Sequence, residues 1–579
     1  MRPRILSLLL TCFGVSTLIA AELEPRVLTT GDLNDQSTWS SFFSAKGDLW
    51  FAFEDARRNI FIRTPAGETR PLFPEAGDRA PSGLVMAPKG ESVALAYRDK
   101  IPDKNLYVID SADWKKFISV GGDTQPLARV KLHGADDSIK VLWFGEKPIK
   151  DSPDPFWLYY REVKANPDSS GLIHRVLPGI YPNWVVDPSG AVGVMSWVAD
   201  GKGKYSIKSR TKAAGTEEFG PEVVVAEVPQ ITYLISTFRS GKRWFIYWDA
   251  KYGDDGLDYL LEGAWSDDLG STWQRFSFPE FQGLDITGVS AAGDGSNVAI
   301  ALSGTMRKKI EGAPEYILFL RSADNGTSWE PAEKLQTREL DVVTATNPKL
   351  AFGALGEVVV AWQDYRDIRA SIRMSYSKNG GKDWSVKDKR VPLTPSKFFK
   401  LNADQESTGI QLGADTIKLV VNQFRDETAQ DKDVVLVELS KVDLATADTE
   451  LAQGESYAKE ALLQRINNFW QAMKDKDYKA AYEYYDPFFR AQTPYEAFWG
   501  MMGKVKYSEF EVLDVDIKGN VAFTKVRFKA SVPRYKTAKG GEFQADEREA
   551  VLDWRWVFVD GLWQREFRSE VTGWRSTPY

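Results

Sequence analysis

The chain has 579 residues, which is too long for one ordinary domain, so two or more folded units are expected. Aromatic residues make up 13% of it, 45 residues are glycine and 43% are apolar, which excludes a disordered chain and favours a globular one rich in strands and turns. The net charge of −7 argues against a general nucleic-acid binder, because such a protein needs a basic surface.

Residues 1–21 have the pattern of a secretion signal. Two arginines precede the apolar run Ile5–Ile19, and Ala20 and Ala21 supply a small-residue cleavage site. The run is short for a membrane span, so we expect cleavage and no span in the mature chain; an uncleaved anchor is the alternative. The only cysteine, Cys12, lies in this segment, so the mature chain has neither a disulfide nor a thiolate metal site. Export to the periplasm or the exterior of a bacterium fits this composition.

Three later segments share one pattern at intervals of 56 and 55 residues. They are Ser266-Asp-Asp268-Leu-Gly270-Ser-Thr-Trp273, Ser322-Ala-Asp324-Asn-Gly326-Thr-Ser-Trp329 and Ser377-Lys-Asn379-Gly-Gly381-Lys-Asp-Trp384. Ser and Asp or Asn side chains bond the backbone of a turn, Gly adopts positive φ, and Trp covers the turn. A period near fifty with strand-like flanks is typical of a β-propeller, and the motif itself is expected to be structural, not catalytic.

These segments resemble the Asp-box, or BNR, repeats of the sialidase-like superfamily. In that family the boxes join the third and fourth strands of a blade, on the face away from the active site. The resemblance implies an all-β propeller with eight blades, or with six or seven as alternatives. The third strands are then expected at Asn59–Arg63, Asn105–Ile109, Phe156–Arg161, Tyr205–Ser209, Tyr259–Trp265, Tyr316–Arg321, Ser371–Tyr376 and Val434–Leu439. Residues Arg26–Thr30 are expected to supply the outer strand of the last blade and close the ring.

We expect the propeller over residues 22–443, a polar linker over 444–455 and a second domain over 456–579. This last part begins with helical periodicity and continues with alternating strands, two of which are joined by Asp560-Gly561. Its element order resembles the nuclear transport factor 2-like fold, an α+β cone. The strand face formed by Leu552, Trp554, Trp556 and Phe558 is expected in the core, with a ligand pocket in the cone as the alternative.

Loops between second and third strands open on the propeller face opposite the boxes, and they are rich in Asp, Arg and aromatic residues. Carboxylates and guanidinium groups bond hydroxyl and acid groups, and aromatic rings cover the apolar faces of sugars. The binding candidates are Asp55, Asp99, Trp248, Asp249, Trp362, Asp364, Arg366 and Arg425. The same loops also contain Asp200, Asp254, Asp255 and Arg307–Lys309. In the alternative interpretation, these charges only solvate the rim.

A sialidase resemblance also implies an arginine clamp, an aspartate acid/base and a tyrosine nucleophile. The catalytic candidates are Arg98, Asp249, Asp364, Tyr365, Arg366 and Arg425. However, the family's Arg-Ile-Pro motif has its nearest match in Arg63-Thr64-Pro65, which falls on the box side of its blade and argues against this activity. The two histidines, His133 and His174, are isolated, so no metal site or cofactor is expected.

The leading hypothesis is therefore an exported propeller that binds a glycan or a protein partner on the face opposite the boxes. One alternative is an exo-sialidase-like glycoside hydrolase. The other is ligand binding by the C-terminal cone, with the propeller as a scaffold.

Overall fold

The structure is a computed structural model of the chain. It describes residues 23–29, 33–34, 38–44, 46–72, 81–99, 105–113, 116–124, 126–135, 137–146, 156–164, 171–179, 181, 183–199, 204–252, 258–306, 315–337, 343–394, 397–401, 409–428, 430–446, 455–502, 505–536, 541–569 and 572–578. The expected signal segment, with Cys12, lies outside the described residues. Within them, no helix has the length and apolarity that a membrane crossing requires.

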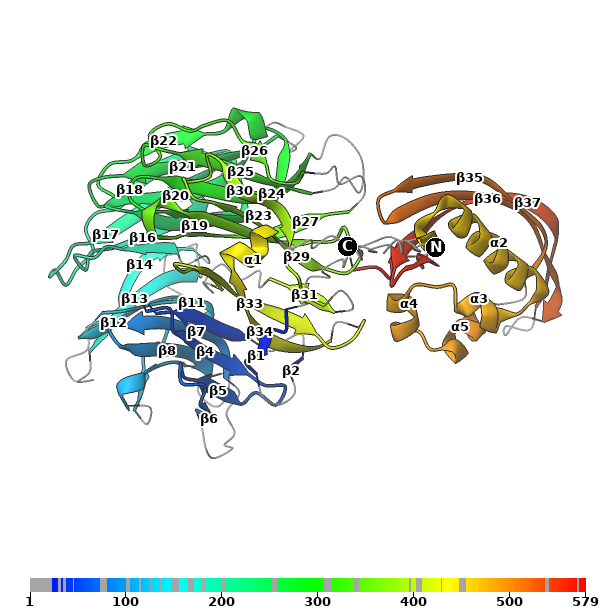
Figure 1. Cartoon of the computed structure of the whole chain (residues 1–579). Helices are drawn as coiled ribbons and strands as arrows, with labels where there is room; N and C mark the ends of the chain where they lie inside the picture. The colour runs from blue at the N-terminus through cyan, green and yellow to red at the C-terminus, as the bar shows by residue number, and fades with distance from the viewer. Residues whose placement is uncertain are drawn as a thin grey trace, which may run out of the picture.

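The first part of the chain forms antiparallel sheets in a propeller-like arrangement (Figure 1). The first four sheets consist of β3 (Trp39–Phe43), β4 (Leu49–Glu54), β5 (Ile60–Arg63) and β6 (Thr69–Pro71); β7 (Pro81–Lys89), β8 (Ser92–Asp99), β9 (Leu106–Asp110) and β10 (Phe117–Ser119); β11 (Pro126–Gly134), β12 (Ser138–Glu146), β13 (Phe156–Lys164) and β14 (His174–Pro178); and β15 (Asn183–Val186), β16 (Val192–Ala199), β17 (Tyr205–Lys212) and β18 (Val223–Val228).

The next three sheets follow the same order. They consist of β19 (Gln230–Ser240), β20 (Arg243–Tyr252), β21 (Asp258–Ser266) and β22 (Gln274–Ser277); β23 (Leu284–Gly293), β24 (Val298–Met306), β25 (Tyr316–Ser322) and β26 (Glu333–Lys334); and β27 (Ala345–Phe352), β28 (Val358–Asp364), β29 (Ser371–Ser377) and β30 (Trp384–Arg390). Each of the eight predicted third strands coincides with a strand of the structure, within a few residues at each end.

One further sheet joins the two ends of this region. It contains β31 (Phe398–Lys400), β32 (Ile410–Leu412), β33 (Thr416–Phe424), β34 (Asp431–Ser440), β1 (Arg26–Val27) and β2 (Leu33–Asn34). Arg26 pairs with Leu436 and Val27 with Val435, so the N-terminal strand lies beside β34 as the sequence predicts. Leu28 is fully buried and packs against Val434 and Leu436. Burial of this strand anchors the start of the chain to its last sheet.

The three box segments form turns between third and fourth strands with one hydrogen-bond scheme. In the second, Ser322 Oγ donates to Asp324 Oδ1 at 2.7 Å and accepts from the Gly326 N–H at 2.7 Å. Asp324 Oδ1 also accepts from the Ser328 N–H at 2.8 Å, and Gly326 has φ of 82°. Ser266 and Ser377 make the corresponding bonds in their own turns. These side chains are therefore engaged within the turns, in the structural role that the sequence predicts.

The C-terminal part is a separate α+β unit (Figure 1). Its helices are α2 (Lys459–Asp475), α3 (Tyr478–Tyr482), α4 (Pro487–Gln492) and α5 (Tyr495–Met501), and its strands are β35 (Lys506–Lys518), β36 (Val521–Lys536), β37 (Glu542–Val559) and β38 (Leu562–Arg565). Asp560 and Gly561 have φ of 54° and 73°, so the Asp-Gly turn forms the expected hairpin between β37 and β38.

The start of the predicted linker is helical. Residues Lys441–Thr446, at the start of the predicted linker, form helix α1, because Leu444 is fully buried against the last sheet. Pro487 occupies the first turn of α4, whose N-terminus is capped by Asp486 accepting from the Phe489 N–H at 2.9 Å.

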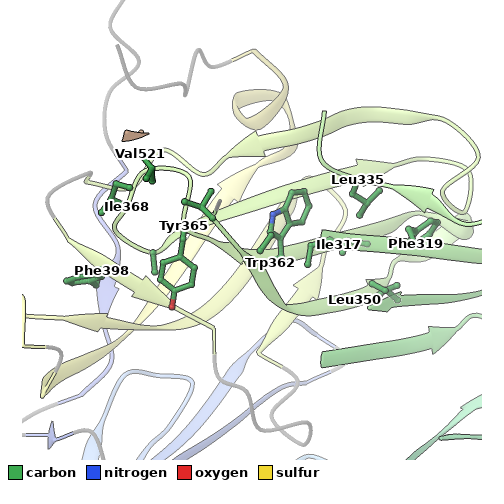
Figure 2. Close-up of a cluster of buried hydrophobic side chains, with 14 of the residues drawn as sticks. Ile317, Phe319, Leu335, Leu350, Trp362, Tyr365, Ile368, Phe398 and Val521 are labelled. Atoms are coloured by element: carbon green, nitrogen blue, oxygen red, sulfur yellow. The ribbon is translucent and has the colours of Figure 1, made fainter. Parts of the chain in front are cut away.

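The two units share one apolar cluster. Val521, Val557 and Val559 of the C-terminal sheet are buried together with Trp362 and Ile368 of the propeller-like part. Figure 2 shows Val521 beside the loop that carries Tyr365 and Ile368. The rings of Phe398 and Phe488 lie 5.4 Å apart at the same junction. The C-terminal unit is therefore packed on the loops that follow β28.

The box turns give a first prediction. Replacing Ser377 with Ala removes the acceptor of the Gly381 N–H inside a buried turn, so we expect Ser377→Ala to lower the free energy of unfolding by about 1–3 kcal/mol. The exposed neighbour Lys378→Ala should change it by less than about 0.5 kcal/mol. Denaturant unfolding measures both, and equal effects would contradict a structural role for the serine.

Candidate functional site

The predicted loop after β28 is locked by ion pairs. Arg366 donates Nε to Asp364 Oδ1 at 2.9 Å and Nη1 to Asp388 Oδ2 at 2.9 Å, and both carboxylates are buried. Burial opposes the charge on Arg366, but the two carboxylates outweigh it and raise the pKa of the guanidinium above its usual value. The charges of Asp364 and Arg366 are thus satisfied by the protein itself. This corrects the expectation that Asp364 and Arg366 are presented to a ligand.

The next arginine of this loop fixes the C-terminal unit. Arg369 donates Nη2 to Asp560 Oδ2 at 2.9 Å and also pairs with Glu427, and its side chain is only 6% exposed. Asn520 Nδ2 donates to the Arg366 carbonyl at 2.7 Å. The residues that follow β28 therefore form a docking surface for the C-terminal unit.

Both tryptophans predicted to contact sugars are core residues. Trp248 and Trp362 are 0% exposed, and their indole N–H groups donate to Glu262 and Asp364 at 3.1 Å. Neither ring presents a face to a ligand. The expectation that a sugar stacks on these rings is wrong, because each ring lies at a strand end and packs into the apolar layer between sheets.

The remaining binding candidates come from four different sheets. Asp99 and Asp249 are both 2% exposed, and Asp55 accepts from the N–H groups of Arg57 and Asn59 within its own turn. Arg425 pairs with Asp433 at 2.7 Å. The structure leaves Arg98 half-buried beside Asp99. Asp200, Asp254, Asp255 and Arg307–Lys309 lie outside the described residues.

Tyr365 is buried at 6% exposure, and its hydroxyl accepts from Gln363 Nε2 at 2.5 Å. Burial raises the pKa of Tyr365 to about 12, although the Gln363 hydrogen bond opposes this shift. A nucleophilic tyrosine needs the opposite shift, toward the phenolate. The environment of Tyr365 therefore favours a structural phenol.

The sequence did not single out Glu315, whose pKa is raised by burial although Thr287 donates to it at 2.7 Å.

A pocket of about 750 Å³ lies at the other ends of the sheets, between the third sheet (β11–β14) and the fourth (β15–β18). Turn residues 135 and 137, 188–190 and 214–217 line its mouth. These turns join first to second or third to fourth strands, so they lie at the sheet ends that carry the box turns in other sheets. We refer to this cavity as the inter-sheet pocket. Its volume is that of a typical ligand site.

The floor of the inter-sheet pocket is charged and buried. Glu162 Oε1 accepts from Ser138 Oγ at 2.7 Å and from Lys140 Nζ at 3.1 Å, and Lys212 Nζ lies 3.8 Å from Glu162 Oε2. Burial opposes ionisation of Glu162, but the Ser138 hydroxyl and the two ammonium groups outweigh it and hold its pKa below the usual value. Lys140 and Lys212 are 5% and 9% exposed. The floor thus carries a preorganised set of charged groups.

Strand alternation builds this floor. Leu158, Tyr160 and Glu162 lie on one face of β13, and Leu158 and Tyr160 pack against Val192 and Val194 of the fourth sheet. In the pairing of β13 with its neighbours, Glu162 lies opposite Lys140 of β12 and Tyr160 lies opposite His174 of β14. The layer between the sheets is therefore apolar inside and becomes polar where it reaches the pocket. Sequence patterns did not reveal this site, because its residues come from strands of two sheets, whereas the predicted candidates lie in loops on the other face.

Among the residues that the structure describes, no group of three or more His, Cys, Asp or Glu side chains is arranged to hold a metal ion. In the C-terminal unit, Trp554 stacks on Trp470 with ring centroids 4.8 Å apart, and the Arg565 guanidinium lies 3.6 Å from the Trp554 ring. These contacts occupy the concave side of the sheet, where the cone alternative requires a ligand.

Neither a scan of family models nor a search of curated proteins finds a match. Among solved structures, the chain is similar to a PL25 ulvan lyase, at 13% identity over 62% of this chain and 94% of that one, with a TM-score of 0.39. It is also similar to the polysaccharide lyase Uly1, at 11% identity over 73% and 100% with a TM-score of 0.40, and to NanB, at 11% over 74% and 99% with a TM-score of 0.30. These neighbours are propeller-like, carbohydrate-active proteins. At such identities the likeness concerns the fold alone.

The Arg369 contacts give a second prediction. We expect Arg369→Met to weaken the attachment of the C-terminal unit by about 2 kcal/mol, because it removes a buried cation that binds two carboxylates. Scanning calorimetry should then separate one unfolding transition into two. Arg527→Met, which breaks exposed pairs with Glu511 and Glu549, is the control and should leave the transition unchanged; equal effects of the two variants would refute the docking role.

The pocket floor gives a third prediction. Because the pKa of Glu162 is lower in the folded chain than in the unfolded one, its ionisation stabilises the fold above the unfolded pKa, and this contribution is lost as pH falls through the lower folded value. We expect Glu162→Gln to lower the free energy of unfolding by about 1–2 kcal/mol at pH 7, and by less below about pH 4. The exposed pocket residue Glu217→Gln is the control. A pH-independent difference would contradict the assignment.

Proposed function

We propose that this protein is an exported glycan-binding propeller whose eight sheets are the blades of one ring and whose ligand enters the inter-sheet pocket. The observation that carries the proposal is a cavity of about 750 Å³ with a buried polar floor. Saccharides are recognised by many hydrogen bonds from fixed groups. The pocket offers such groups on strands: Glu162 as an acceptor, and Lys140 and Lys212 as donors.

The architecture supports a binding role over a sialidase role. A sialidase clamp needs guanidinium groups that are available to the substrate carboxylate, and here Arg366 and Arg425 are paired with carboxylates of their own sheets. The loop that carries Arg366 also supports the C-terminal unit. We assign that unit to assembly of the whole protein, with the propeller as the ligand-binding part.

A pair of neighbouring alanines provides the test. Ala214 lines the inter-sheet pocket, whereas Ala213 is exposed beside it and is not a lining residue. We expect the full-length protein to bind members of a saccharide array, and Ala214→Trp to weaken that binding at least about tenfold by filling the pocket. Ala213→Trp should bind as the wild type does. Absence of saccharide binding, or equal effects of the two variants, would overturn the proposal.

A further inference from the structure

We propose that the floor of the inter-sheet pocket is a subsite for one acidic group of the ligand, a carboxylate or a sulfate, which Tyr160 and Lys212 would bind. This inference rests on the proposed function and specifies its substrate class as an acidic saccharide. It concerns the box-turn ends of the third and fourth sheets, not the face on which the arginine candidates lie.

The Tyr160 hydroxyl is the first observation. Tyr160 is 0% exposed and lines the pocket, yet its hydroxyl has no hydrogen-bond partner among the residues that the structure describes. A buried donor without a partner costs free energy, and because Tyr160 lines a pocket, an acceptor on a bound ligand would remove that cost. Burial, and then the charge of Glu162, raise the pKa of this phenol above its usual value. Tyr160 therefore remains protonated and can donate to a ligand oxygen.

The balance of buried charge is the second observation. Two ammonium groups, on Lys140 and Lys212, share the single carboxylate of Glu162. Glu162 lies closer to Lys140, at 3.1 Å, than to Lys212, at 3.8 Å, so Lys212 is the less completely compensated cation. An excess buried positive charge is unfavourable unless an anion pairs with it. A ligand carboxylate or sulfate supplies that charge.

Neighbouring groups restrict what can occupy this floor. The rings of Phe219 and His174 pack beside the Tyr160 ring, with centroids 5.4 Å and 6.3 Å from it. The acidic residues Asp137 and Glu217 lie at the exposed mouth, where solvent screens them. The floor thus has an excess of donors and of positive charge. A neutral sugar hydroxyl would accept the hydrogen bond from Tyr160 but would leave the positive charge of Lys212 without an anion.

The test uses the full-length protein on an array that presents the same oligosaccharide backbones in neutral, uronic-acid and sulfated forms. We expect an acidic form to bind at least about tenfold more tightly than its neutral counterpart, and the uronic-acid and sulfated forms show which acid is preferred. Calorimetry of the tightest binder then compares the wild type with Tyr160→Phe and Lys212→Met. Each variant should lower the preference for the acidic over the neutral form by about tenfold, because only the acidic form brings an anion to these two groups.

Tyr159→Phe is the matched control. Tyr159 is also buried with a hydroxyl that lacks a partner, but it lies on the other face of β13, against the second sheet. It should bind both forms as the wild type does. If neutral and acidic forms bind the pocket equally, or if Tyr160→Phe and Tyr159→Phe behave alike, the acidic subsite is wrong while the proposed function stands. If no saccharide binds at all, the proposed function fails and this inference falls with it.

Discussion

The contact on which the arrangement of the protein depends is the buried ion-pair system of the loop after β28. Arg366 is held between Asp364 and Asp388 inside one sheet, and this fixes the backbone that presents Arg369. Arg369 then reaches across to Asp560 of the C-terminal unit and to Glu427 of the last sheet. Buried pairs of this kind contribute little net stability, but they specify one geometry because an unpaired charge there is strongly unfavourable. The apolar cluster shared by both units provides the favourable burial.

This contact gives the two ends of the sheets different roles. At one end, the loops of the last two sheets support the C-terminal unit, and their charged groups are paired with one another. At the other end, short turns leave the inter-sheet pocket open between the third and fourth sheets. Because its floor residues belong to paired strands and not to long loops, they are held in place before any ligand arrives, which lowers the ordering cost of binding.

Local patterns predicted the fold well and the site poorly. The Ser-x-Asp-x-Gly turns and the alternating strands follow from interactions within about ten residues, so their positions could be read directly, as could the pairing of Arg26 and Val27 with the last sheet. The sequence placed Trp362 at the correct strand end and Arg366 in the correct loop, but it gave both the wrong environment. The residues around them, Val521 for Trp362 and Asp388 for Arg366, are distant in sequence. Lys140, Glu162 and Lys212 meet only after two sheets pack, so no local pattern reveals them. The one available signal was the change from Leu158 to Tyr160 to Glu162 along a single strand face.

The central claim is that ligand binds at the box-turn ends of the third and fourth sheets and not at the ends covered by the C-terminal unit. Hydrogen–deuterium exchange of the full-length protein, with and without a saturating saccharide, tests this most directly. The account predicts slower exchange in residues 137–140, 171–174, 188–190 and 212–217, with residues 364–370 unchanged. Protection confined to residues 364–370 and 424–428 would contradict it.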